Sequence, residues 1–173
     1  MGGSLTAAKI YVNQGGLFKG AGTIDVANFV NSGIVAPGNS PGTLTINGNY
    51  TQAGGILEIE LGGTGVGEYD VLNITGVADL AGTLKLLLYG DYTASVVEVG
   101  DFFDVLFASA ITGEGFTIDG SATRWTWDVD YLTDRVRITA EAPVPVPPSV
   151  WLLGSGLLGL FGLRRKFRKQ LGG

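Results

Sequence analysis

Two glutamates, Glu58 and Glu60, have the residue type and close spacing from which a glycosidase could draw its pair of carboxylates. They alternate with Leu57, Ile59 and Leu61, so in a strand both glutamates point away from the core. A solvated outward row is therefore the expected role. The chain has no histidine and no cysteine, which removes thiolate zinc sites, cysteine nucleophiles and histidine acid–base catalysis. We expect no catalytic site and no enzymatic activity.

Three aspartates near the end of the body, Asp128, Asp130 and Asp134, carry oxygens that calcium accepts as ligands. The glycine of an EF-hand loop is missing around them. The glycine-rich stretch 62–67 has Gly67 where a calcium-binding G-G-x-G-x-D repeat has its aspartate. We expect no cofactor and no bound metal, with calcium as the alternative.

Three aromatic residues, Trp125, Trp127 and Tyr131, lie at even spacing and share one face of a strand. Such a row closes the apolar end of a β core, which is the expected role. The alternative is that the rings stack on sugars, as they would in a carbohydrate-binding module or a polysaccharide-active enzyme.

The net charge of −5 conceals an uneven distribution. Residues 1–163 carry six basic and all 16 acidic residues, while five basic residues lie together at 164–169. An acidic body repels phosphates, so nucleic acid is not an expected partner. The basic end indicates a membrane or a targeting signal.

Composition changes twice near the C-terminus. Four prolines within 143–148 predict an extended spacer. Val150–Leu163 follows as 14 residues without a charge, and as a helix it would span about 21 Å. Trp151 at one interface and basic side chains at the other would extend this run across the inner membrane. Because positive flanks stay cytoplasmic, residues 1–142 are expected outside as an exported β-rich domain, and 149–173 form the sorting segment.

These C-terminal residues resemble the PEP-CTERM sorting signal of Gram-negative bacteria. The family's V-P-E-P reads V-P-V-P here, and V-P-V-P-P-S resembles the variant VPLPA/VPxPP signals. The resemblance implies recognition by an exosortase, an inner-membrane cysteine protease, with transient anchoring, cleavage near the spacer and transfer to the cell surface or release. The residues that carry it are Val144, Pro145, Val146, Pro147, Pro148, Ser149, Trp151, Gly154, Gly156, Gly159, Gly162, Arg164, Arg165 and Lys166.

The first residues, M-G-G-S-L-T-A-A-K, have neither the basic start nor the apolar run of a signal peptide. Export requires such a peptide, so we expect the chain to be a fragment of a longer precursor.

The body repeats one pattern, a glycine followed by an apolar–polar–apolar triplet. The leading glycines are Gly22, Gly42, Gly55 and Gly82, separated by 20, 13 and 27 residues. The triplets place Ile24/Val26, Leu44/Ile46, Leu57/Ile59 and Leu84/Leu86 on the inner face, and Asp25, Thr45, Glu58 and Lys85 on the outer face. This pattern predicts an all-β fold, a parallel β-helix or solenoid, with no helix before residue 149.

Longer strands are expected in the second half, at 69–74, 83–89, 102–107, 124–129 and 136–140. Asn47-Gly48 has the composition of a two-residue hairpin turn. A β-sandwich with hairpins, above all for 67–140, is therefore the alternative fold.

Residues 31–107, with W-D-V-D-Y-L-T-D-R-V-R-I-T at 127–139, resemble the end of autotransporter-type surface passengers. That resemblance implies a right-handed β-helix displayed at the cell surface and no catalytic residues. The expected function is an exported surface or extracellular-matrix structural protein of biofilm, associated with extracellular polysaccharide. A cell adhesin is a further alternative.

Overall fold

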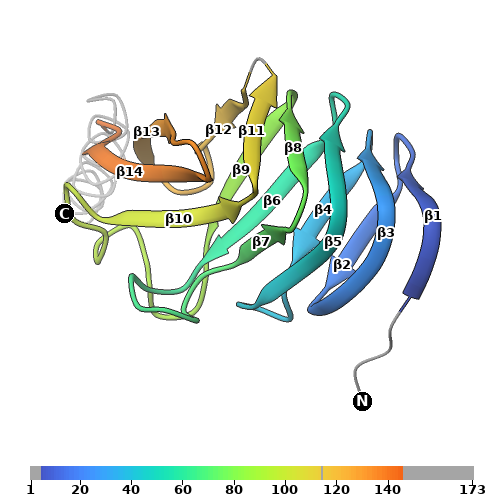
Figure 1. Cartoon of the computed structure of the whole chain (residues 1–173). Coiled ribbons are helices and arrows are strands. Elements are labelled where there is room, and N and C mark those ends of the chain that lie inside the picture. The colour runs from blue at the N-terminus through green and yellow to red at the C-terminus, as the bar shows by residue number, and fades with distance from the viewer. Residues whose placement is uncertain (1–4, 114, 146–173) are drawn as a thin grey trace, which may run out of the picture. The chain divides into compact units, whose positions relative to one another are not determined.

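The computed structural model describes residues 5–113 and 115–145, and these residues form β-strands and loops only (Figure 1). The prediction of an all-β body is confirmed. The chain divides into two compact units, Met1–Pro143 and Val144–Gly173, and the first of them, the body, carries all the strands described here. No helix long and apolar enough to cross a membrane was found among the described residues. The expected membrane helix at 150–163 lies outside them.

The body contains two sheets. The larger sheet contains β1 (Leu5–Val12), β3 (Gly22–Asn31), β5 (Thr43–Gln52), β7 (Val71–Ile74), β8 (Val77–Leu80), β10 (Phe102–Phe107), β11 (Ala110–Gly113), β13 (Trp125–Tyr131) and β14 (Arg135–Pro143). The smaller sheet contains β2 (Leu17–Gly20), β4 (Ile34–Pro37), β6 (Ile56–Leu61), β9 (Thr83–Leu88) and β12 (Thr117–Asp119).

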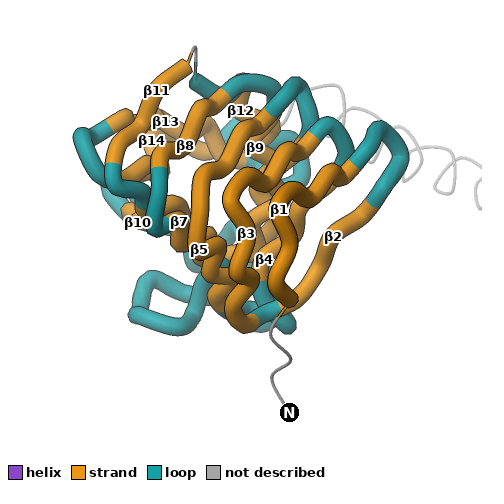
Figure 2. The backbone as a smooth tube through the Cα atoms, turned by 45° about the vertical axis from the view of Figure 1, so that its right-hand side comes forward, coloured by secondary structure: helices purple, strands orange, loops and turns teal. Residues whose placement is uncertain are grey.

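The chain passes back and forth between the sheets, and equivalent strands pair in parallel (Figure 2). In the larger sheet β1, β3, β5 and β7 follow one another, and in the smaller sheet β2, β4, β6, β9 and β12 do the same. Parallel neighbours cannot be joined by tight hairpins, so each connection must cross to the other sheet.

Apolar side chains stack in rows between the sheets. Ile24 pairs with Ile46, and Ile46 pairs with Ile74, and all three are almost fully buried. In the smaller sheet Leu57 and Leu84 pair and are fully buried. All eight inward positions of the glycine-led triplets are buried, as predicted.

The repeat length grows along the chain, which explains the irregular glycine spacing. In the larger sheet paired positions are 19 residues apart between β1 and β3, 22 between β3 and β5, 28 between β5 and β7 and 34 between β7 and β10. The leading glycines divide between the sheets, since Gly22 begins β3 of the larger sheet and Gly55 precedes β6 of the smaller one. Their separations therefore do not measure a repeat.

The longest strands bend in the middle. The pairing of β3 with β5 is irregular between Asp25 and Asn28, and beyond this bend the single strand β5 faces two strands, β7 and β8. Asn47 and Gly48 lie at the bend, within β5. The hairpin predicted at these two residues is therefore wrong: a glycine here relieves a close backbone approach inside a strand.

A polar staple closes one turn of the stack. Asn31 and Gln52 are buried and lie side by side in register. The Asn31 Nδ2 donates to Gln52 Oε1 at 3.0 Å and to the Ile56 carbonyl oxygen at 2.9 Å, and Asn31 Oδ1 accepts from the Gly33 amide at 3.0 Å. Buried backbone groups at this turn thus obtain partners without water.

The C-terminal end of the body changes to antiparallel pairing. Strand β14 lies between β10 and β13 and is antiparallel to both. The other strand pairs within 67–140 (β7–β10, β8–β11 and β9–β12) are parallel, whereas a hairpin-linked sandwich requires antiparallel neighbours.

Candidate functional site: the C-terminal end of the body

Strand β14 carries the chain from the folded body into the residues that the sequence assigns to sorting. Its last residue, Pro143, lies opposite Trp125 of β13. Val144 and Pro145, which follow, are exposed. The sheet therefore ends at the start of the proline-rich spacer.

An aromatic cluster seals the core beneath β14. Phe103 is fully buried, and its ring centroid lies 5.3 Å from that of Tyr69, 6.0 Å from that of Tyr92 and 5.9 Å from that of Trp127. Tyr92 belongs to the long loop between β9 and β10, and its hydroxyl donates to Asp101 Oδ2 at 2.6 Å. The loop is thereby held over the end of the core.

The three aromatic residues proposed for glycan contact lie on one face of β13, but they differ in access. Trp125 is only 7% exposed, and its indole nitrogen donates to the Ala94 carbonyl oxygen at 2.9 Å. Trp127 is half-buried and donates to Thr123 Oγ1 at 2.9 Å. Tyr131 is 42% exposed, and its hydroxyl accepts from the Phe116 amide. Of the three rings, Tyr131 therefore offers the largest accessible surface.

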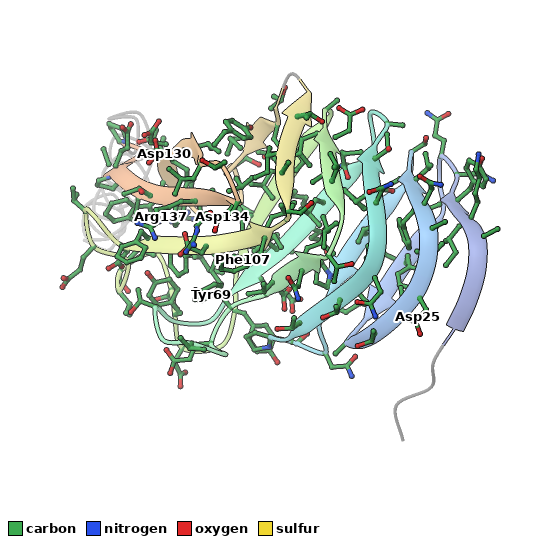
Figure 3. All side chains as sticks on the ribbon, in the orientation of Figure 1. Asp25, Tyr69, Phe107, Asp130, Asp134 and Arg137 are labelled. Carbon is green, nitrogen blue, oxygen red and sulfur yellow. The ribbon has the colours of Figure 1, made fainter. Side chains whose placement is uncertain are left out.

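The outer face of β10 and β14 carries an ion-pair cluster (Figure 3). Asp104 accepts from Arg137 Nε at 2.8 Å and from Arg137 Nη2 at 2.9 Å, and Arg135 Nη1 lies 3.4 Å away. These hydrogen bonds, chiefly those from Arg137, hold the pKa of Asp104 below its usual value. The Arg137 guanidinium also lies over the Phe102 ring, 4.3 Å from its centroid.

The aspartates weighed as calcium ligands do not converge. Asp134 accepts two hydrogen bonds of 2.9 Å from Arg135, which occupies its carboxylate. Asp128 and Asp130 lie on β13, where Asp130 pairs with Arg137 of β14. Within the described part of the chain no group of three or more acidic residues is placed to hold a metal ion.

The paired glutamates of β6 bind lysines from neighbouring strands. Lys85 Nζ lies 2.9 Å from Glu58 Oε2, and Lys19 Nζ lies 3.7 Å from Glu60 Oε1. The hydrogen bond and charge of Glu58 raise the pKa of Lys85. Both pairs lie on the outer face of the smaller sheet and join adjacent strands, which is a structural arrangement.

Asp70 is a buried carboxylate that the sequence reasoning missed. It is 1% exposed, with Oδ1 accepting from the Gly42 amide at 2.8 Å and Oδ2 from the Glu60 amide at 3.0 Å. Burial raises its pKa to about 6, while the two amide donors oppose that shift. Asp70 thus joins the starts of β5 and β7 to β6. The only sequence signal is an aspartate directly before an apolar strand.

The remaining sorting residues, Val146 to Lys166, lie outside the described residues, and their sequence decides the identification. Residues 143–166 match the family described as the PEP-CTERM protein-sorting motif. This chain carries a PEP-CTERM sorting motif. The motif indicates a secreted protein that an exosortase sorts through the membrane to the cell surface, so that part of the prediction is confirmed. No curated protein and no solved structure matches the chain.

The motif begins where the fold ends. Its first residue, Pro143, is also the last residue of β14. The body is therefore complete before the motif starts, apart from that shared residue.

Proposed function

We propose that the chain is an exported structural protein of the cell surface or extracellular matrix, delivered by an exosortase and associated with extracellular polysaccharide. One observation carries the proposal: a PEP-CTERM motif follows directly on a body that is already closed at Pro143. A passenger of this design keeps its fold when the motif is cut away.

Several features of the body support a structural role. Parallel backbone ladders run through both sheets, and ion pairs such as Lys85–Glu58 join neighbouring strands on the outside. Rows of stacked apolar residues fill the inside. We propose that this stack is a right-handed parallel β-helix of the autotransporter-passenger type, since such ladders form a stiff element without a metal or a disulfide.

We propose that the tail first spans the inner membrane through residues 150–163. Arg164, Arg165 and Lys166 would stay in the cytoplasm and the body outside, because basic flanks are retained on the inner side. Val146, in place of the glutamate of the V-P-E-P form, assigns the motif to the VPLPA-type variants and their exosortase.

A fusion experiment tests sorting. Residues 142–173 are attached to a secreted reporter and expressed with and without an exosortase of the matching type. We expect a shorter, released reporter only when the exosortase is present. The control fusion carries Gly-Ser repeats in place of 144–148 and is expected to remain uncut. Equal processing in cells without exosortase would refute the proposal.

A carbohydrate-binding role has one observation in its favour, the accessible Tyr131 ring beside the aromatic end of the core. If that ring stacks on sugars, Tyr131→Ala weakens binding to extracellular polysaccharide in a pull-down, whereas Tyr11→Ala, at the opposite end of the body, does not. Equal binding by both variants would exclude the role.

A further inference from the structure

The two ends of the body are finished differently. At the C-terminal end, the β10–β14–β13 sheet and the 89–101 loop cover the core, and Phe103 there is fully buried. At the other end, β1 and β2 are the edge strands of their sheets and pair on one side only among the described strands (Figure 1). Terminal repeats of stacked folds need a polar cap, because an open end exposes both the core and unpaired backbone groups.

The first turn of the stack leaves part of its core uncovered. Ile10 and Phe18 are only partly buried, although the residues they stack on, Phe29 and Val35, are fully buried. Exposed apolar side chains accompany them, with Leu17 at 63% exposed. This open end combines strand edges with apolar surface, which is the combination that binds an added strand.

The pattern of β1 identifies what fits this edge. Ala7 and Ile10 stack over Val26 and Phe29, so both occupy inward positions on either side of the strand's bend. In an antiparallel pair of two β1 strands with Ala7 opposite Ile10 of the second copy, inward positions meet only inward positions. The same register places Ala8 opposite Lys9 of the second copy, so the two Lys9 side chains do not face each other.

We propose that this open end is a self-association surface, on which a second copy of the chain docks about a two-fold axis with β1 antiparallel to β1. Closed two-fold symmetry is consistent with the capped C-terminal end, because a body open at one end forms a dimer and no fibre. The pairing covers Ile10 and Phe18 and satisfies the backbone edge of β1.

The full chain in detergent tests the proposal by light scattering corrected for bound detergent. The expected protein mass is twice the 18.0 kDa of the chain. Ile10→Glu and Phe18→Glu should each halve the mass, whereas Val99→Glu, at a 70% exposed position near the capped end, should leave it unchanged. A monomeric wild type would leave a foreign strand as the occupant and overturn the proposal. A dimer that survives Ile10→Glu, held by the tail, would overturn it as well.

Cross-linking provides a readout that does not depend on how these glutamates affect folding. The chain has no cysteine, so single substitutions give a clean signal. Copies with Ala8→Cys mixed with copies carrying Lys9→Cys should form a mixed disulfide on mild oxidation, because directly opposed strand positions lie within disulfide reach. Val66→Cys copies, exposed elsewhere, should not link. A dimer without the Ala8–Lys9 link would exclude the proposed register and overturn the proposal.

Discussion

Gly48 lies at the bend of β5, where two strands approach most closely. A Cβ at this position would fall on the carbonyl oxygen of Val26, well inside contact distance. We expect Gly48→Ala to lower the free energy of unfolding by about 3 kcal/mol or more, because the clash is with backbone that cannot move aside. Urea unfolding measures the change.

Gly20 provides the matched control for that substitution. Its φ of 145° is close to the 154° of Gly48, but a Cβ there would meet nothing within 4 Å. Gly20→Ala therefore carries the cost of the backbone angle without the clash. Equal losses in the two variants would show that the close approach to Val26 is unimportant.

Asp70 makes the stability of the body depend on pH. Its pKa is about 6 in the folded body and about 4 in an unfolded chain, so the folded state binds the extra proton between these values. The free energy of unfolding is therefore expected to fall as the pH rises from about 4 to 6, by on the order of 2–3 kcal/mol, and to level off above. Urea unfolding at a series of pH values measures the slope.

Asp70→Asn is the variant that isolates this effect. The amide cannot titrate, and its nitrogen would face the Glu60 amide donor, so the variant should be weaker at all pH values but lack the slope. A slope that persists in Asp70→Asn would assign the titration to another group.

At this scale the sequence showed the outward glutamates of β6 but not Asp70. Alternation within one strand placed Glu58 and Glu60 on the outer face, as the structure has them. The partners of Asp70 come from Gly42 and Glu60, 28 and 10 residues away, on separate strands. No local pattern encodes such a meeting.

Among the elements, the antiparallel sheet at the C-terminal end depends on one carboxylate. Asp104 is bound by Arg137 and Arg135, with its side chain 13% exposed and theirs 32%. Asp104→Asn should lower the free energy of unfolding by about 1–2 kcal/mol, since two half-buried guanidinium groups lose their shared charge partner. Asp128→Asn, on the exposed face of β13, should change it by less than about 0.5 kcal/mol.

The pH dependence of the Asp104 contribution has the opposite sign to that of Asp70. Because the pKa of Asp104 is lowered in the folded state, its contribution is present above the unfolded value of about 4 and is lost as the pH falls through the folded value. Equal stability of wild type and Asp104→Asn at neutral pH would show that the ion pair has no net effect.

Strand positions were predictable where alternation was strong. The strand expected at 102–107 has those same bounds in the structure, and β9 ends one residue before its expected end. The expectation failed at Asn47-Gly48, where a typical turn dipeptide lies inside a strand. The parallel neighbours β3 and β7 pair with β5 on both sides of this bend and keep the chain extended, and such long-range pairing overrides local turn preference.

For the whole molecule, we predict that the body folds without its tail. The unit Met1–Pro143 contains the entire core of the described residues, so a chain that ends at Pro143 should unfold in urea at the same midpoint as the full chain. A chain that ends at Thr133 loses β14, which uncovers Phe103 and Leu106, and should not unfold cooperatively. Far-ultraviolet circular dichroism during urea titration measures both. A midpoint that falls on tail removal would contradict the prediction.

The sequence by itself determined the all-β class, the inward apolar triplets and the sorting motif. Each of these is written in residues close together in the chain, as alternation within a strand or as a run of prolines, apolar residues and arginines. Only the tertiary structure decided which strands are neighbours, that the repeat lengthens from 19 to 34 residues, and that Asp70 is buried among distant amides. Those features depend on how loops of unequal length bring remote segments together, and the order of residues along one strand does not encode that.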